Sequence, residues 1–210
     1  METLKRSAIT LAIMCLALSF PFRSFSQDYT ALQTAFKNSY AWENKAEYSK
    51  AVEEIKKVYD ENSYELNLRL GWLTYESGLF TESLAYYQKA IALMPYAVEP
   101  KFGYVYPAAA LGNWDKVMTQ YVDILKIDPN NTLANYRLGS IYYGKENYNE
   151  AFKFFEKVAN LYPFDYDNML MFAWANYKLG KLREAKVLFG KVLLMKPEDS
   201  SALEGLSLIK

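Results

Sequence analysis

The sequence has no histidine and a single cysteine, Cys15, which lies in the first 26 residues. From residue 27 onwards it therefore lacks the thiolate and imidazole groups that most nucleophilic and metal-binding sites use, and it has no disulfide. A catalytic site would have to be built from carboxylates, lysines or tyrosines, and the pattern singles out no pair of carboxylates. We expect no catalytic residue, no metal site and no cofactor, so the protein is not expected to be an enzyme.

The chain also lacks an excess of charge of either sign. Its 24 Lys and Arg residues balance 24 Asp and Glu residues, and no run of like charge occurs. Proteins that bind nucleic acid or anionic membranes concentrate positive charge on one part of the chain. The sequence therefore predicts neither partner.

Long apolar runs are absent after residue 26, so no integral membrane span is expected there. Within residues 1–26, two basic residues precede a mostly apolar run that is shorter than the roughly 20 residues needed to cross a bilayer. This pattern is typical of a secretory signal peptide. We expect cleavage after Ser26 and export to the periplasm or the cell exterior; with Gln27 first, the site resembles signal peptides of Bacteroidota. The alternatives are an uncleaved anchor and a lipoprotein acylated at Cys15.

The remaining chain has a strict internal period. Four prolines stand 34 residues apart with no insertion or deletion between them: Pro95, Pro129, Pro163 and Pro197. We call the residue n positions before a proline place n. Place 17 is glycine in three of the four units, as at a turn, and places 12, 8 and 5 carry a small or short, an aromatic and an apolar residue on one helical face. Such a period indicates stacked helix-turn-helix units in which the proline ends the second helix.

Two units carry the motif most clearly. Their motif residues are Leu70, Gly71, Gly78, Phe80, Tyr87, Ala90 and Pro95, and then Leu138, Gly139, Tyr142, Tyr148, Ala151, Phe155 and Pro163. This pattern resembles the tetratricopeptide repeat. The resemblance implies an all-α fold, a right-handed superhelical α-solenoid that forms one domain over residues 27–210. The implied units span about 30–63, 64–97, 98–131, 132–165 and 166–199, with a C-terminal capping helix at about 200–210.

Three departures from the pattern carry further expectations. Pro107 lies inside the first helix of its unit, where we expect a kink. Ser63 stands where the first unit would have its proline. Near the C-terminus, Ser201 and Glu204 have the spacing of a capping box. The apolar stripe expected on the capping helix consists of Leu203, Leu206 and Ile209.

Aromatic residues are concentrated at places 27, 23 and 20, which form one stripe on every first helix because their spacing is i, i+4, i+7. Ten of these fifteen positions are aromatic when the first unit is counted from Ser63, whereas the 17% aromatic content of the chain predicts two or three. In tetratricopeptide arrays this stripe lines the concave groove. The expected partner-binding residues, here called the aromatic stripe, are Tyr40, Trp72, Tyr75, Phe102, Tyr106, Tyr136, Tyr143, Trp174 and Tyr177.

Arg69 and Arg137 are the only first-helix arginines of the array, and each follows a stripe position. We expect them to flank the groove and to bind an acidic side chain; the alternative is that both are solvated charges. The stripe itself also has an alternative, ordinary packing between repeats, above all at Phe36, Phe102 and Tyr136. The lysines and asparagines of a carboxylate clamp, by which some family members hold a C-terminal acid, do not occupy the stripe.

These features predict a non-enzymatic scaffold that binds a peptide or helix of another envelope or secreted protein through tyrosine and tryptophan anchors. One alternative is glycan binding, because aromatic faces stack on sugar rings. The other is self-association into a homo-oligomer, through the stripe or through an exposed end formed by Leu206, Leu208 and Ile209.

Overall fold

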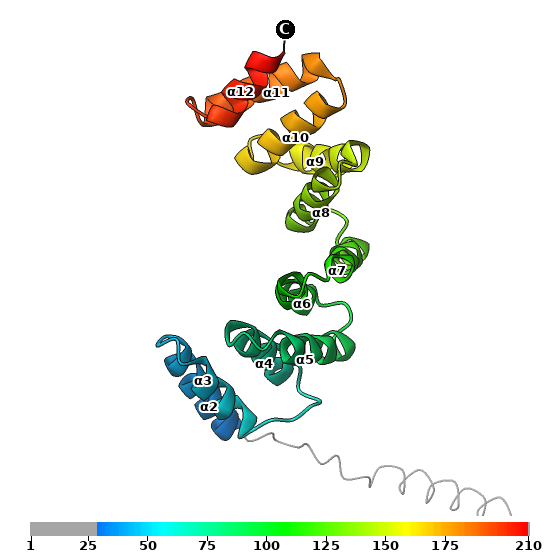
Figure 1. Ribbon diagram of the computed structural model, residues 1–210. Helices are drawn as coiled ribbons and strands as arrows, with labels where there is room; N and C mark the ends of the chain where they lie inside the picture. Colours follow the sequence, from blue (N-terminus) through cyan, green and yellow to red (C-terminus); the bar gives the residue numbers. More distant parts are fainter. Residues whose placement is uncertain (1–28, 210) are drawn as a thin grey trace, which may run out of the picture. The chain divides into compact units, whose positions relative to one another are not determined.

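The computed structural model describes residues 29–209, and all regular structure in that range is helical. The helices are α2 (Tyr29–Glu43), α3 (Tyr48–Lys56), α4 (Tyr64–Glu76), α5 (Phe80–Leu93), α6 (Glu99–Ala110), α7 (Trp114–Ile127), α8 (Thr132–Gly144), α9 (Tyr148–Leu161), α10 (Tyr166–Lys178), α11 (Leu182–Met195) and α12 (Ser200–Leu208) (Figure 1). The all-α prediction is confirmed. The predicted signal peptide lies outside the described residues.

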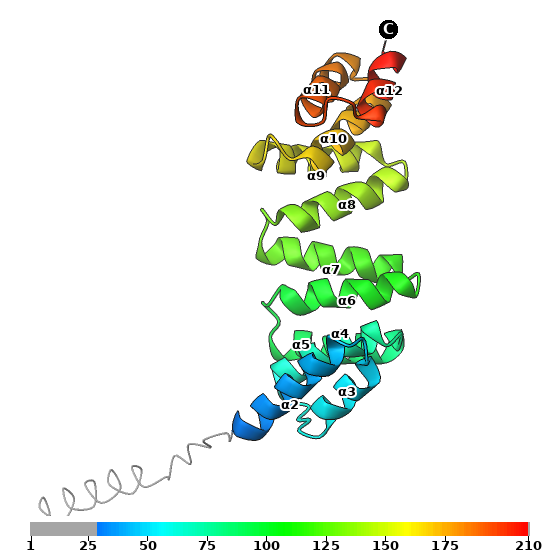
Figure 2. The ribbon, with the colours of Figure 1, turned by 90° about the vertical axis from the view of Figure 1, so that its left-hand side faces the viewer.

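The chain divides into two compact units between residues 34 and 35, inside α2, and the packing described here is that of residues 35–209. From α3 to α12, each helix packs against the next one along the chain, as the two views in Figures 1 and 2 agree. Successive first helices also touch, α4 with α6, α8 with α10, and α10 with α12. This is the predicted solenoid of helix-turn-helix units, with α12 packed on α11 at its end.

The turn inside each unit has the same backbone geometry. The residue at place 17 has a positive φ in all five units: Ala46 (57°), Gly78 (75°), Gly112 (71°), Glu146 (59°) and Gly180 (73°). Its N–H donates to the carbonyl three residues earlier, and the next N–H donates to the carbonyl five residues before it, which closes a Schellman motif. Ala46 and Glu146 form this turn although neither is glycine. The turn therefore aligns equivalent residues of all five units, including the first, which does not end in proline.

The second helices end as the prolines predict, since α5, α7, α9 and α11 each stop two residues before their proline. The first unit differs. Its second helix, α3, ends at Lys56, and Ser63 is the N-cap of α4, where its hydroxyl accepts a hydrogen bond from the Leu66 N–H at 3.3 Å. Ser63 therefore begins the second unit rather than ending a helix. Helix α6 continues through Pro107 to Ala110.

Aromatic residues at place 8 fill the core by packing against glycines. Tyr87 lies between α4 and α6: a Cβ built on Gly71 would lie 2.9 Å from its ring, and one built on Gly103 would lie 2.1 Å from it. Phe155 contacts Gly139 in the same way, and Phe189 contacts Gly205 of α12. These aromatic side chains are buried, as predicted.

The capping helix forms, and Leu206 and Ile209 of its predicted stripe pack against the core of the last unit, but the capping box and Leu203 do not fit the prediction. The N-cap is Asp199, whose Oδ1 accepts a hydrogen bond from the Ala202 N–H at 2.9 Å, whereas the Ser201 Oγ accepts one from Trp174. The helix therefore begins two residues earlier than a capping box at Ser201 requires. Its inward face carries Ala202 and Gly205, and Leu203 is 48% exposed.

Asp199 joins α12 to the rest of its unit, because its Oδ2 accepts a hydrogen bond from the Tyr166 hydroxyl at 2.5 Å and pairs with Lys196 at 3.1 Å. We expect Asp199→Ala to lower the free energy of unfolding by about 1–2 kcal/mol, as for other lost N-caps. Urea titration measures the loss, and Glu198→Ala, which removes an exposed neighbouring carboxylate, is the matched control.

The same carboxylate gives a pH dependence with a defined sign. The Tyr166 hydroxyl, followed by the Ala202 N–H and Lys196, lowers the pKa of Asp199 below its usual value, although burial opposes this. Because the folded-state pKa is the lower one, the stabilisation is complete at neutral pH and is lost as the pH falls from about 4 through the folded-state pKa. The acid branch of the stability curve should be flatter in Asp199→Ala; an unchanged branch would contradict this assignment.

Candidate functional site

None of the nine residues of the aromatic stripe is fully buried. Tyr40 and Tyr106 are each 51% exposed, and the other seven are half-buried. Between α4 and α6 the stripe is continuous: the ring centroids of Trp72 and Tyr75 are 5.9 Å apart, and those of Tyr75 and Tyr106 are 5.6 Å apart. These tilted contacts hold the rings in place and leave part of each one on the surface.

Other stripe residues make contacts with the core as well. Phe102 packs on Tyr121 with a centroid distance of 6.3 Å, and Tyr136 packs on Phe155 at 6.0 Å. Since both remain half-buried, they join core and surface. The alternative of packing between repeats thus describes part of what these two residues do.

The C-terminal members of the stripe belong to the packing of the last unit. The Trp174 ring lies 5.6 Å from that of Tyr177 and 5.0 Å from that of Phe189, and its Nε1 donates a hydrogen bond to the Ser201 Oγ at 2.9 Å. Tyr143 stands apart from these and packs on Tyr148 at 5.2 Å; burial raises the pKa of its hydroxyl.

Arg69 is neither a free binding group nor a solvated charge. Its side chain is only 7% exposed, and its Nη2 lies 2.6 Å from the Glu43 Oε2, while its Nε donates a hydrogen bond to the Ser39 Oγ at 3.0 Å. The guanidinium also lies 3.9 Å from the centre of the Tyr40 ring. Trp72 donates its Nε1–H to the other oxygen of Glu43 at 2.5 Å. Both expectations for Arg69 are therefore wrong, because Glu43 of α2 already neutralises it.

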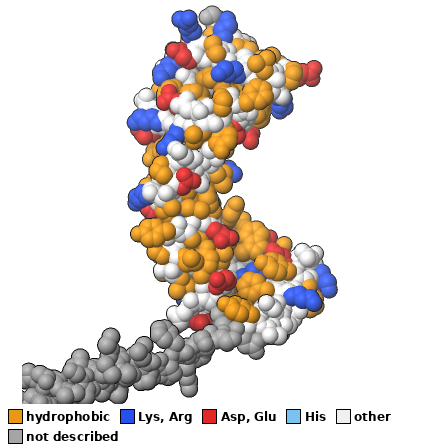
Figure 3. All heavy atoms as spheres, turned by 180° about the vertical axis from the view of Figure 1, so that it is seen from behind, with side chains coloured by type: hydrophobic (Ala, Val, Ile, Leu, Met, Phe, Trp, Pro, Cys, Tyr) orange, Lys and Arg blue, Asp and Glu red, His pale blue; other side chains and the backbone are white. Residues whose placement is uncertain are grey.

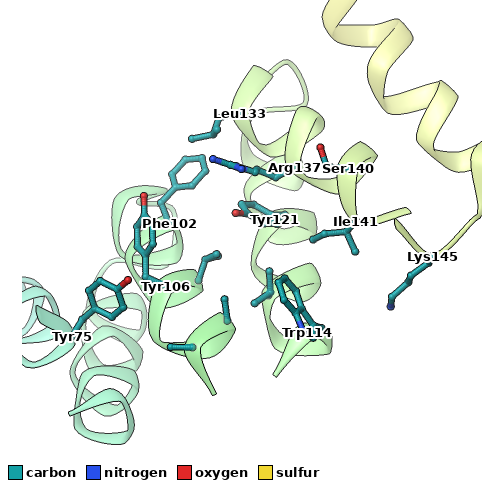
Figure 4. A pocket seen from close by; sticks show the side chains of 14 residues that line it. Tyr75, Phe102, Tyr106, Trp114, Tyr121, Leu133, Arg137, Ser140, Ile141 and Lys145 are labelled. Atoms are coloured by element: carbon teal, nitrogen blue, oxygen red, sulfur yellow. The ribbon is translucent and has the colours of Figure 1, made fainter. Parts of the chain in front are cut away.

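A pocket of about 750 Å³ opens between α6, α7 and α8, and this is where stripe residues meet other side chains (Figure 4). Figure 3 shows hydrophobic side chains gathered about half-way along the array. The pocket is lined by Tyr75, Phe102, Val105, Tyr106, Ala109, Ala110, Trp114, Val117, Tyr121, Leu133, Arg137, Ser140, Ile141 and Lys145. Three stripe residues and Arg137 thus share one cavity, while Tyr40, Trp72, Tyr136, Tyr143, Trp174 and Tyr177 lie outside its lining.

The helices around the pocket differ from their neighbours at place 26 and in how closely they pack. At place 26, Gly103 lets α6 approach Tyr87 of α5, and Gly205, at the same position of the repeat in α12, lets α12 approach Phe189. In α8 this position holds Arg137, which is exposed and does not pack beneath a core ring. Helices α7 and α8 contact each other less than α5 and α6 do, and α6 and α8 hardly touch. The space between them is the pocket.

The charged side chains that line the pocket are all positive. Arg137 and Lys145 are both exposed, and no Asp or Glu is among the lining residues. Within residues 29–209, Arg137 makes no ion pair, and it lies 5.9 Å from the Tyr136 ring. Burial raises the pKa of Tyr121, and the charge of Arg137 opposes this in part. Arg137 extends from α8 over the pocket toward α6 (Figure 4). The site offers an apolar cavity with an unneutralised cation at its edge.

Sequence reasoning missed Trp114, Lys145 and Tyr121 as pocket residues. Trp114, two residues after the turn glycine Gly112, is 51% exposed. The available signal was the change from Gly103 to Arg137 at the same place of consecutive units.

Within the described part of the chain, no three or more His, Cys, Asp or Glu side chains gather in a way that would hold a metal ion. None of the helices in residues 29–209 combines the length and apolarity that crossing a bilayer requires.

The sequence profile of the tetratricopeptide repeat matches residues 132–165, and comparison with curated protein sequences gives no match. Among solved structures, the chain resembles a tetratricopeptide repeat protein from Parabacteroides merdae, with a TM-score of 0.72, 21% identity, and coverage of 84% of this chain and 71% of that one. MamA 41-end from Desulfovibrio magneticus RS-1 has a TM-score of 0.67 and 17% identity over 81% of this chain and 98% of that one.

A third similar structure is YrrB, described as a tetratricopeptide repeat protein with an unusual peptide-binding site. Its TM-score is 0.64 at 19% identity, with coverage of 77% of this chain and 81% of that one. At these identities the likeness concerns the fold. Together with the 34-residue period, the repeated turn geometry and the profile match over residues 132–165, it shows that this chain has the tetratricopeptide repeat fold.

Proposed function

We propose that this protein is a non-enzymatic scaffold that binds a peptide or helix of another protein along the aromatic stripe and in the adjoining pocket. One observation carries the proposal: the stripe runs from Trp72 through Tyr75 and Tyr106 to the pocket and remains partly exposed, whereas place 8 aromatics are buried. Tyrosine and tryptophan combine a large apolar area with a polar group, which favours them as anchors in protein interfaces. YrrB, which has a similar fold, is described as having a peptide-binding site.

The proposed location is the periplasm or the cell exterior, and the proposed partner is another envelope or secreted protein. This part of the proposal rests on the sequence of residues 1–26, which has the pattern of a signal peptide. Immunoblotting of cell fractions tests it: a shortened chain in the exported fraction is expected, and a full-length chain confined to the cytoplasm would contradict it.

Affinity capture tests the binding surface. We expect Tyr106→Ala/Trp114→Ala to reduce recovery of the specific partner at least about tenfold, since an interface anchor typically contributes 2 kcal/mol or more. Tyr96→Ala/Phe164→Ala is the matched control, because it removes two aromatic residues that are 84% and 67% exposed in the loops between units. Partners should be identified by mass spectrometry and confirmed with purified proteins.

Equal loss in both double variants, or no loss in either, would contradict binding along the stripe. Two further measurements separate the other functions. Quenching or enhancement of tryptophan fluorescence by oligosaccharides would favour glycan binding, and sedimentation of a dimer that the Tyr106→Ala/Trp114→Ala variant converts to monomer would favour self-association.

A further inference from the structure

The Arg69 site contains its own ligand. There, the Glu43 carboxylate of α2 lies between Arg69 and Trp72 of α4. Its Oε2 forms an ion pair with the Arg69 Nη2 at 2.6 Å, and its Oε1 accepts a hydrogen bond from the Trp72 Nε1 at 2.5 Å. The Tyr40 ring lies against the guanidinium. A carboxylate at this position is thus held by a cation, a polar donor and an aromatic face.

The pocket repeats this arrangement two units later without the carboxylate. In the register set by the turns, the Ala46 N–H donates to the Glu43 carbonyl and the Gly112 N–H donates to the Ala109 carbonyl, so Ala109 is the counterpart of Glu43. The other counterparts follow from the same register: Tyr106 for Tyr40, Arg137 for Arg69 and Ser140 for Trp72. All four lie in the pocket lining.

We propose that the pocket binds a glutamate or aspartate side chain of the partner segment, and that Arg137 pairs with this carboxylate in the position that Glu43 fills beside Arg69. The inference rests on the proposed function, because it specifies the chemistry of the segment that lies along the stripe. An apolar residue next to the acid enters the cavity beside Trp114, Val117 and Ile141.

Two features favour a carboxylate over other polar groups, and a third concerns the size of the ligand. The lining has two cations and no acid, so an acidic ligand meets attraction and no repulsion. A guanidinium presents parallel donors that match a carboxylate, and it does so best where apolar walls exclude water. The cavity, at about 750 Å³, is also within the range of pockets that enclose a sizeable ligand.

The first experiment places a carboxylate in the pocket from within the chain. We expect Ala109→Glu to melt about 2–4 °C above Ala109→Gln, because the new acid pairs with Arg137 as Glu43 pairs with Arg69. In an Arg137→Gln background this difference should vanish. Equal melting temperatures of Ala109→Glu and Ala109→Gln in the wild-type background, or a difference that survives Arg137→Gln, would overturn the proposed pairing.

The second experiment uses peptides added to the intact protein. The probes are N-acetylated, C-amidated nonapeptides with one phenylalanine and one glutamate at separations of one to four positions, a matched set with glutamine, and a set whose only carboxylate is C-terminal. We expect the best glutamate peptide to bind about tenfold more tightly than its glutamine counterpart. Arg137→Gln and Ala109→Glu should each abolish this preference.

The outcomes separate the two proposals. If glutamate and glutamine peptides bind equally, and Tyr106→Ala/Trp114→Ala abolishes both, the scaffold function stands and the inference about the acid is wrong. If the peptides with a C-terminal carboxylate bind most tightly, the ligand of Arg137 is a chain end and not a side chain. That result would overturn the inference. Binding by none of the sets would count against both proposals.

Discussion

Gly103→Ala should destabilise the array by about 1–3 kcal/mol although it adds only one methyl group. The new Cβ would lie 2.1 Å from Cε1 of Tyr87, far inside contact distance. The Tyr87 ring cannot move away, because Gly71 of α4 lies against its other side, where a Cβ would be 2.9 Å from the ring. Helix α6 must therefore shift away from α5, and the contacts between the second and third units are lost with it.

The matched control is the same substitution at Gly190, in the interior of α11. A Cβ there meets nothing within 4 Å, so Gly190→Ala should raise stability by about 0.5–1 kcal/mol by removing the conformational freedom of glycine in the unfolded chain. Urea titrations followed by circular dichroism measure both changes. A loss of similar size in the two variants would show that glycine conformation, and not contact with Tyr87, determines the effect.

Much of the fold is predictable because the residues that set it act locally. The prolines end α5, α7, α9 and α11 two residues ahead, and glycine marks three of the five turns. The start of α12 differs from its prediction because several serines and acids near a helix start have cap chemistry, and only the folded backbone decides which side chain reaches an N–H. Asp199 rather than Ser201 does so at α12.

The candidate site is also predictable in part: local sequence determines some of its features, and packing between units determines the others. The period places the aromatic stripe on the first helices, because position within a repeat determines which face a side chain occupies. It does not determine which charges are already paired: Glu43 lies in the unit before Arg69, and the ion pair depends on how the two units pack. The pocket likewise lies between units, and its lining comes from α4, α6, α7 and the unit that begins with α8.

Phe155→Ala should be among the most destabilising single changes in the protein, at about 3–5 kcal/mol, as for other buried phenylalanines. Its side chain has no exposed surface, packs on Gly139 of its own unit and lies 6.0 Å from the Tyr136 ring. Truncation leaves a cavity between α8 and α9 that neighbouring backbone, held by its helical hydrogen bonds, cannot fill. Chemical denaturation measures the loss, and Phe164→Ala, in an exposed loop, should change stability by less than about 0.5 kcal/mol.

A double-mutant cycle identifies the contact that causes this loss. Alone, Gly139→Ala should destabilise, because its Cβ would lie 2.6 Å from Cε1 of Phe155. In the Phe155→Ala background the ring is absent and the added methyl group enters the cavity, so the same substitution should become neutral or stabilising. We expect a coupling free energy of about 1–3 kcal/mol. Additive losses would mean that Gly139 is required for its backbone freedom, and the close packing of place 8 aromatics on first-helix glycines would then not be what joins the two helices of this unit.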